Sequence, residues 1–279
     1  MQLKHFPITV TPGQCGSPCR GERADLAAYL LDPMPETSTR LRPAVILCPG
    51  GGYNHLSARE DQPPAMAYLS MGFQVFVLHY SLAPNRFPRS LMELALAVDL
   101  VRRNSASFFV DPRRIMVSGF SAGGHLAASL GVYWNQEFVY GPLGLKAEDI
   151  RPDGLVLCYP VITGGAFAHR GSLECLMGAE NAGNEAARSA FSLEEQAGPH
   201  VPPTFLWHTD TDQTVPVENS LLFASALKRH GVSLELHIFP SGCHGLSLAG
   251  HETEGADGKY CEPCCQDWIR MAGRWIESR

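Results

Sequence analysis

The sequence lacks any apolar stretch long enough to cross a lipid bilayer. Its longest continuous apolar runs, such as Ala44 to Cys48, are far shorter than the roughly 20 residues that a membrane-spanning helix needs. The first ten residues, MQLKHFPITV, also lack the basic segment and following apolar segment of a secretory signal peptide. We therefore expect a cytoplasmic protein with no membrane partner.

Runs of lysine and arginine are also absent, and the formal net charge is −6. This charge gives no reason to expect binding to nucleic acid or to an anionic membrane surface. The 279 residues are 45% hydrophobic and 18% charged, a composition typical of a soluble globular protein. Because no internal repeat, low-complexity tract or linker divides the chain, we expect a single domain over residues 1–279, and a homo-oligomer is compatible with the sequence.

Cysteine, in contrast, is frequent: the chain has nine. Cys48 and Cys158 end apolar, strand-like runs, which indicates buried thiols. The others of interest lie in turn-rich segments near the two ends, where a shared zinc site is an alternative to free thiols. Their spacings match no standard zinc pattern, so we expect no metal and reduced thiols. These end residues are Cys15, Cys19, Cys261, Cys264 and Cys265.

One stretch, RIMVSGFSAGGHLAA, predicts a reactive serine. Residues 114–118 indicate a buried strand, Gly119 to Gly123 spell G-x-S-x-G around Ser121, and a helix rich in Ala and Leu follows. A strand that turns sharply into a helix with Ser at the apex is the nucleophile elbow. We expect a Cβ at position 119 or 123 to collide with the neighbouring strand and helix. The alternative is a surface loop of Gly and Ser, which the flanking strand and helix disfavour.

The rest of the chain alternates apolar strand patterns with helical patterns. This alternation predicts an α/β fold with a doubly wound, mostly parallel sheet, preceded by an antiparallel hairpin. Residues 161–203 have little strand pattern, and we expect them to form a small lid. The predicted strands are 8–10, 24–31, 43–48, 74–80, 114–118, 154–159, 204–208 and 234–239; the predicted helices are 63–71, 90–104, 124–130, 217–230 and 264–278, with a turn at Asp111-Pro112.

Ser121 needs a base and a supporting acid, because a serine hydroxyl is a poor nucleophile at neutral pH. In hydrolases with this elbow the chain order is Ser, then Asp or Glu, then His. Asp212 follows the predicted strand TFLWH and His244 follows the last predicted strand, at the sheet edge where parallel strands place their sites. Asp210 competes for the role of the acid, and we prefer Asp212 because the pattern H-x-x-x-D-x-x-V-P places the acid there.

The negative charge that develops during acyl transfer needs backbone N–H donors aimed at it. Ala122, directly after the predicted nucleophile, is expected to supply one donor. The PGGGY loop after the first buried parallel strand is expected to supply others, from Gly51 and Gly52. Among the other histidines, His125 is expected to pack or cap rather than to act as the base.

Together, the motifs PGGGY, SAREDQPPA, GFSAGGHLAA, AHRGS, HTDTDQTVPVENS and GCHGLSL resemble bacterial acetylesterases of the α/β-hydrolase fold, which are also described as acetyl xylan esterase-like. The resemblance covers about residues 43 to 250. It implies an α/β-hydrolase fold, catalysis by Ser121, Asp212 and His244, and an oxyanion hole formed by Gly51, Gly52 and Ala122. One departure is Pro49, where many relatives carry His, but the donors at that loop are backbone groups.

We therefore expect a serine esterase that uses no cofactor. Its expected substrates are small-molecule esters with short acyl groups, and the family resemblance points to acetylated sugars. An arylformamidase-like amidase or a general carboxylesterase is the main alternative. A binding protein on a hydrolase fold is disfavoured, because such proteins often lose a member of the triad and all three residue types are present here. A metal-binding or redox module at the terminal cysteines is the third alternative.

Overall fold

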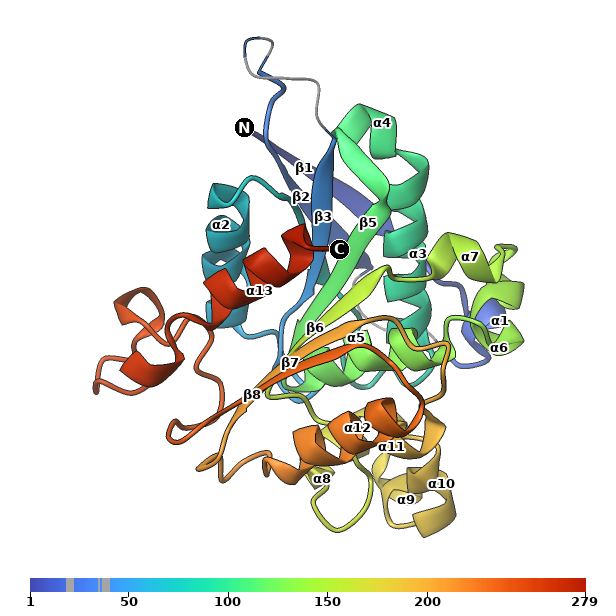
Figure 1. Ribbon diagram of the computed structural model, residues 1–279. Coiled ribbons are helices and arrows are strands. Elements are labelled where there is room, and N and C mark those ends of the chain that lie inside the picture. The colour runs from blue at the N-terminus through green and yellow to red at the C-terminus, as the bar shows by residue number, and fades with distance from the viewer. Residues whose placement is uncertain (19–22, 35, 37–40) are drawn as a thin grey trace.

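The computed structural model describes residues 1–18, 23–34, 36 and 41–279. Its centre is an eight-stranded sheet with the spatial order β1-β2-β4-β3-β5-β6-β7-β8, shown in Figure 1. The sheet is parallel from β4 to β8, whereas β2 runs antiparallel to both of its neighbours. The strands are β1 (Gln2–Ile8), β2 (Ala24–Leu30), β3 (Arg42–Cys48), β4 (Gln74–His79), β5 (Val110–Phe120), β6 (Gly154–Cys158), β7 (Thr204–Thr209) and β8 (Leu234–Phe239).

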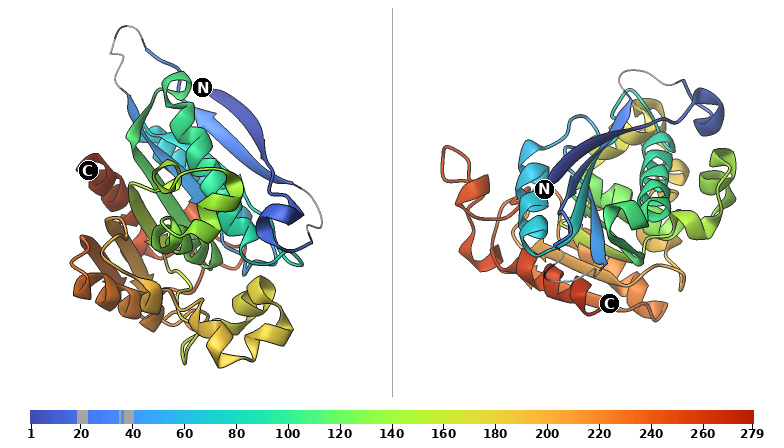
Figure 2. Two further views of the ribbon diagram at one scale, coloured as in Figure 1. Left: turned by 90° about the vertical axis from the view of Figure 1, so that its right-hand side faces the viewer. Right: turned by 90° about the horizontal axis from the view of Figure 1, so that it is seen from above.

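Helices cover both faces of the sheet, as the continuous apolar strand runs require. Figure 2 shows α2 and α3 on opposite sides of the sheet, and α13 lies on the side of α2 in Figure 1. In β4, Phe76 packs into the core under α3 and α5, while Val75 and Val77 pack into the core under α2 and α13. The predicted doubly wound α/β architecture is confirmed. The five long helices are α2 (Gln62–Ser70), α3 (Arg89–Arg103), α5 (Ala122–Tyr133), α12 (Glu218–Arg229) and α13 (Trp268–Glu277).

The opening hairpin exists, but the prediction placed its first strand wrongly at 8–10. The strand β1 covers Gln2–Ile8 and pairs with β2 from Gln2–Leu30 to Ile8–Ala24. Its first four residues are exposed, because β1 lies at the edge of the sheet and is held mainly by backbone hydrogen bonds to β2. An exposed edge strand carries little apolar alternation, so its residues do not form a recognisable strand pattern.

The predicted turn at Asp111-Pro112 is a bulge inside a longer strand. The pairing of β3 with β5 jumps from Arg42–Val110 to Ala44–Ile115, so the residues between Val110 and Ile115 have no counterparts in β3. Proline lacks the N–H that a regular ladder needs and is tolerated at such bulges. The bulge therefore extends β5 back to Val110 without breaking it.

Residues 161–203 contain four short helices and no strand. This agrees with the weak strand pattern of the segment. The helices are α8 (Arg170–Met177), α9 (Ala179–Ala182), α10 (Glu185–Ser189) and α11 (Leu193–Gln196). Elsewhere the chain adds α1 (Pro12–Cys15), α4 (Ser105–Phe108), α6 (Glu137–Tyr140), α7 (Ala147–Ile150) and the 3-10 turns η1 (Ala58–Glu60), η2 (Gly141–Leu143), η3 (His251–Thr253) and η4 (Pro263–Cys265).

Within the described ranges, no helix has both the length and the apolar character needed to cross a membrane.

Candidate active site

Ser121 lies at the sharp turn between β5 and α5, with φ 53° and ψ −119°. Such a positive φ is uncommon for a residue with a side chain. A Cβ added at Gly119 would lie 2.1 Å from the carbonyl O of Gly123, and one added at Gly123 would lie 2.1 Å from the carbonyl O of Cys48. The predicted steric reason for both glycines is confirmed, because Gly119 lies against the start of α5 and Gly123 lies against the end of β3.

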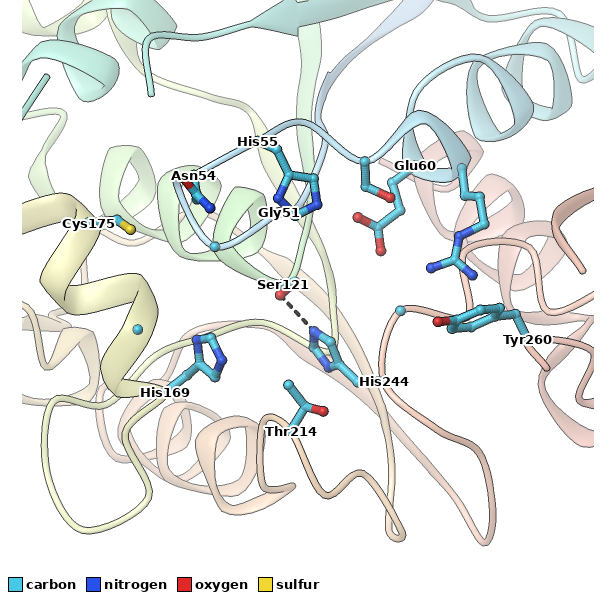
Figure 3. Close-up of a pocket in the computed structure, with 15 residues that line it drawn as sticks. Gly51, Asn54, His55, Glu60, Ser121, His169, Cys175, Thr214, His244 and Tyr260 are labelled. Atoms are coloured by element: carbon cyan, nitrogen blue, oxygen red, sulfur yellow. Dashed lines mark hydrogen bonds between the residues drawn. The ribbon is translucent and has the colours of Figure 1, made fainter. Parts of the chain in front are cut away.

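The structure brings Ser121 together with two residues from distant loops. The Nε2 atom of His244 lies 2.7 Å from the Oγ of Ser121, and this interaction is dashed in Figure 3. The Nδ1 atom of the same ring lies 2.6 Å from Oδ2 of Asp212. Asp212 follows β7 and His244 follows β8, at the carboxyl ends of neighbouring parallel strands. The geometry is that of a hydroxyl, a base and an orienting carboxylate in a chain of hydrogen bonds.

Asp212 is buried and yet held in its charged form. Burial by itself raises the pKa of this carboxyl, but hydrogen bonds from His208 and His244 outweigh it and hold the pKa well below its usual range. The second oxygen, Oδ1, accepts the backbone N–H groups of Thr214 and Val215 at 2.9 and 3.0 Å. Asp210, the competing candidate, is exposed, so the structure brings Asp212 rather than Asp210 to His244.

The PGGGY loop lies beside Ser121, as Figure 3 shows for Gly51. Gly51 has φ +123° and Gly52 has φ +65°, and a Cβ at Gly51 would lie 2.1 Å from the carbonyl O of His55. Among the described residues, the N–H of neither glycine donates a hydrogen bond to the backbone. These N–H groups and that of Ala122, the first residue of α5, are therefore available donors near Ser121.

A buried hydrogen-bond network that the sequence analysis missed connects the loops of the site. Glu60 accepts the N–H of Gly50 at 2.9 Å with one oxygen and the hydroxyl of Tyr159 at 2.7 Å with the other. The Tyr159 hydroxyl in turn accepts the N–H of Ser247 at 2.9 Å, and the Ser247 hydroxyl donates to the carbonyl O of Arg59. The only sequence signal was an acidic residue in the SAREDQPPA segment close to the glycine loop.

Tyr159 also packs directly against His244. Its ring meets the ring of His244 edge-to-face, with 5.1 Å between centroids, and its φ of 36° lies in the left-handed region. Trp207 packs against the ring of Tyr159, with 5.0 Å between centroids. The imidazole is thus held by packing as well as by Asp212, which limits its freedom to rotate away from Ser121.

A pocket of about 460 Å³ opens above Ser121 and His244. The segment 161–203 supplies part of its wall, through His169 and Cys175. On another side, the guanidinium of Arg59 stacks on the ring of Tyr260 at 3.3 Å from the centroid. Many of the lining residues carry a polar group, although more of the exposed wall is apolar than polar. The full lining is Gly51, Gly52, Asn54, His55, Ser57, Arg59, Glu60, Ser121, His169, Gly171, Cys175, Thr214, His244, Gly245 and Tyr260.

His125 packs beneath the elbow instead of acting at the site, as predicted. Its Nδ1 lies 3.0 Å from the hydroxyl of Tyr53 and its Nε2 lies 3.2 Å from the carbonyl O of Phe191. Burial lowers the pKa of His125 to about 4. The ring is therefore a neutral core residue at physiological pH.

Among the residues that the structure describes, the cysteines of the two ends do not gather into a shared site. Cys15 packs with Met92 of α3, whereas Cys265 packs into the core on the opposite face of the sheet. Cys19 lies outside the described residues. Cys48 and Cys158 are buried, as predicted, and burial raises the pKa of both thiols. One group near the C-terminal cysteines has metal-ligand character, with donor atoms within 4.8 Å of one another: His251, Glu254 and Cys261.

Comparisons with known proteins agree on one family. Residues 32–227 match the sequence profile of the BD-FAE family. The chain is 36% identical over 217 residues to endo-1,4-beta-xylanase B of Butyrivibrio fibrisolvens, a match that covers 76% of the chain and 33% of that protein. It is 27% identical over 239 residues to the acetylxylan esterase of Xylanibacter ruminicola, covering 84% of the chain and 45% of that protein. The chain thus spans a third to less than half of the length of these curated relatives.

A solved structure matches over nearly its whole length. The acetyl ester-xyloside bifunctional hydrolase from Caldicellulosiruptor lactoaceticus superposes with a TM-score of 0.81 at 39% identity. This match covers 99% of the chain and 96% of that structure. The similarity therefore includes the opening hairpin and the segment 161–203 as well as the central sheet.

Proposed function

Because the chain belongs to the BD-FAE family of α/β hydrolases, we propose that it is a serine esterase for short acyl esters, above all acetyl esters of carbohydrates. The observation that carries this proposal is the chain of hydrogen bonds from Ser121 Oγ to His244 and on to Asp212, at 2.7 and 2.6 Å. These distances are those of a nucleophile, its base and the orienting acid.

The proposed reaction has two acyl-transfer steps. Ser121 Oγ attacks the ester carbonyl carbon while its proton moves to His244 Nε2, and the carbonyl oxygen becomes an oxyanion. Collapse of this intermediate breaks the bond to the alcohol oxygen, which takes the proton from His244, and leaves the acyl group on Ser121. A water molecule then attacks the acyl carbon while His244 Nε2 takes its proton. The bond from the acyl carbon to Ser121 Oγ breaks, Oγ takes the proton back from His244, and the carboxylic acid is released. Asp212 orients the ring and stabilises its positive charge in both steps.

The oxyanion is proposed to bind the N–H groups of Ala122, Gly51 and Gly52. Such donors act most strongly when they are fixed before the reaction, because no rearrangement is then needed as charge develops. The bond from Gly50 N–H to Glu60 supports this fixation, since it anchors the glycine loop to a buried carboxylate. The helix α5 begins at Ala122, so the positive end of its dipole also faces the developing charge.

The proposal of acetylated sugars as substrates has two supports. Relatives and a structural neighbour are named acetylxylan esterase and acetyl ester-xyloside hydrolase. The pocket also offers polar side chains, among them Asn54, His55 and Thr214, that could form hydrogen bonds with the hydroxyl groups of a sugar. We further propose that residues 161–203 act as a small lid, because α8 supplies one wall of the pocket.

The experiment that tests the proposal compares the wild-type protein with Ser121→Ala. We expect the wild type to release acetate from acetylated xylo-oligosaccharides and from simple acetyl esters. The variant should lose roughly 10⁴-fold or more in rate while its far-UV circular dichroism and Tm stay the same. Variant activity within tenfold of wild type would reject the nucleophile. Faster turnover of N-formylkynurenine than of every acetyl ester would favour the amidase alternative.

A further inference from the structure

His169 differs from the other pocket residues in that one edge of its ring contacts Ser172 at the start of α8 and the other edge faces the pocket. The ring is half-buried and lines the same pocket as Ser121 and His244. Figure 3 shows it across the pocket from His244, with Ser121 between them. The proposed triad does not use His169, so its place in the pocket needs an explanation of its own.

The engaged edge of the ring caps the helix α8. Nδ1 of His169 accepts the backbone N–H of Ser172 at 3.3 Å, in the position of a helix N-cap. The hydroxyl of Ser172 lies 2.8 Å from the same nitrogen. A proton on Nδ1 would point at the N–H of Ser172 and at the positive end of the helix dipole. Nδ1 is therefore an acceptor, and the proton of the neutral ring lies on Nε2.

The surroundings also keep the ring neutral. Burial lowers the pKa of His169, and the neighbouring His244 lowers it further. Within the described part of the chain, the Nε2 of His169 makes no hydrogen bond, whereas its Nδ1 contacts Ser172. The pocket thus contains a neutral N–H donor whose tautomer is fixed from behind and whose proton has no protein acceptor in the described residues.

The place of this donor indicates which half of the ester it meets. The leaving oxygen must lie next to His244 Nε2, because that nitrogen returns the proton to it. The alcohol half of the ester therefore extends into the space beside His244, and His169 faces that space. A Cβ at Gly52 would lie 3.7 Å from the hydroxyl of Ser172, so the start of α8 also adjoins the glycine loop.

We propose that His169 Nε2–H donates a hydrogen bond to a hydroxyl group of the alcohol half. This hydroxyl lies on the carbon next to the one that carries the ester oxygen. The site would then select esters of diols and sugars over esters of simple alcohols. This inference rests on the proposed esterase function and deepens it by naming the feature of the alcohol that is recognised. His169 is a positioning residue in this scheme, since it takes no part in the transfer of the proton.

Two reciprocal variants separate recognition from helix capping. Asn at position 169 can place its carboxamide oxygen where Nδ1 lies, so His169→Asn keeps the cap and loses the donor at Nε2. Gln can place its amide N–H near Nε2, so His169→Gln keeps a donor and loses the cap. The substrates are also a matched pair, trans-2-hydroxycyclohexyl acetate and cyclohexyl acetate, which differ by one hydroxyl group. The readouts are the ratio of kcat/KM between the two substrates and the Tm.

We expect the wild type to favour the hydroxylated ester. His169→Asn should lower this ratio about tenfold, the loss of roughly one hydrogen bond, with little change in Tm. His169→Gln should keep most of the ratio and lower the Tm by a few degrees. A ratio that His169→Asn leaves unchanged would overturn the proposal. So would equal losses on both substrates, which would give His169 a structural role alone.

The outcomes also distinguish this inference from the proposed function. If the wild type hydrolyses neither acetate, or if Ser121→Ala hydrolyses both, the esterase mechanism itself fails. If Ser121-dependent hydrolysis is present but the wild type does not discriminate between the two esters, the inference about His169 fails and the esterase function stands.

Discussion

His208 and His244 approach the same carboxylate oxygen of Asp212. The Nδ1 atom of His244 lies 2.6 Å from Oδ2, and the Nε2 atom of His208 lies 3.3 Å from it. His208 is completely buried, and its Nε2 also lies 2.9 Å from the carbonyl O of Val215. Because a carbonyl can only accept, Nε2 carries the proton of this ring. His208 thus directs an N–H toward the carboxylate that is hydrogen-bonded to His244.

The first prediction concerns the identity of the acid. Asp212→Asn should lower kcat by about 10³- to 10⁴-fold, because the amide cannot stabilise a positively charged His244 and its NH₂ group disfavours the productive tautomer. The matched control is Asp210→Asn, which makes the same chemical change at an exposed position two residues away. It should leave kcat within about threefold of wild type. Steady-state kinetics on one acetyl ester measures both, and the opposite order would transfer the role to Asp210.

The second prediction follows from the lowered pKa of Asp212. In the unfolded chain this carboxyl titrates near pH 4, whereas in the folded chain its pKa is lower. Its charge therefore stabilises the folded state fully above about pH 4, and this contribution is lost as the pH falls toward the folded pKa. The free energy of unfolding of wild type should exceed that of Asp212→Asn at pH 7, by on the order of 2 kcal/mol.

Urea denaturation of both proteins between pH 7 and pH 3 measures this difference. It should shrink as the pH falls below about 4, because the wild-type carboxyl is then protonated in the unfolded chain. A difference that stays constant over this range would mean that the charge of Asp212 does not contribute to stability.

The third prediction is a limit on the acyl group. The pocket is lined by imidazole, guanidinium, carboxylate and amide groups, and its volume is about 460 Å³. A long alkyl chain would remove water from these groups without replacing their hydrogen bonds. We expect kcat/KM on a dodecanoyl ester to be at least tenfold below that on the acetyl ester of the same alcohol. Equal values, measured below the critical micelle concentration, would show that the pocket accepts lipid-like acyl chains.

The fourth prediction tests the close packing at the elbow. Gly123→Ala would place a Cβ 2.1 Å from the carbonyl O of Cys48, a contact that the structure can relieve only by moving β3 or α5. We expect a large loss of stability, roughly 3 kcal/mol or more, together with loss of activity. Gly13→Ala is the control, since a Cβ at Gly13 meets nothing within 4 Å. Differential scanning calorimetry of both variants checks this, and equal Tm values would contradict the steric argument.

The parts of the molecule that could be predicted from sequence are those encoded locally. The strand, the G-x-S-x-G turn and the helix around Ser121 are contiguous, and each has a steric reason visible in its residue types. Asp212 and His244 could be paired with Ser121 because the fold places the carboxyl ends of parallel strands at one edge of the sheet. The catalytic roles of these residues remain predictions until the variants are measured.

The parts that escaped prediction depend on contacts between distant segments. The edge strand β1 has exposed residues and forms through its pairing with β2. Glu60 and Tyr159 are far apart in sequence, and neither residue type alone indicates that they share a hydrogen bond. His169 could not be singled out from the sequence, because its role depends on the contact of its ring with the start of α8.

The hydrogen bond from the Ser247 hydroxyl to the carbonyl O of Arg59 joins two segments that are synthesised at different times. A ribosome releases Ser121 and the glycine loop long before it synthesises His244 and Ser247. The loop that carries His244 follows β8, so this loop can approach Ser121 only after β8 has paired with β7. A nascent chain that ends before His244 therefore contains Ser121 without its proposed base, and the proposed site is complete only after synthesis has passed Ser247.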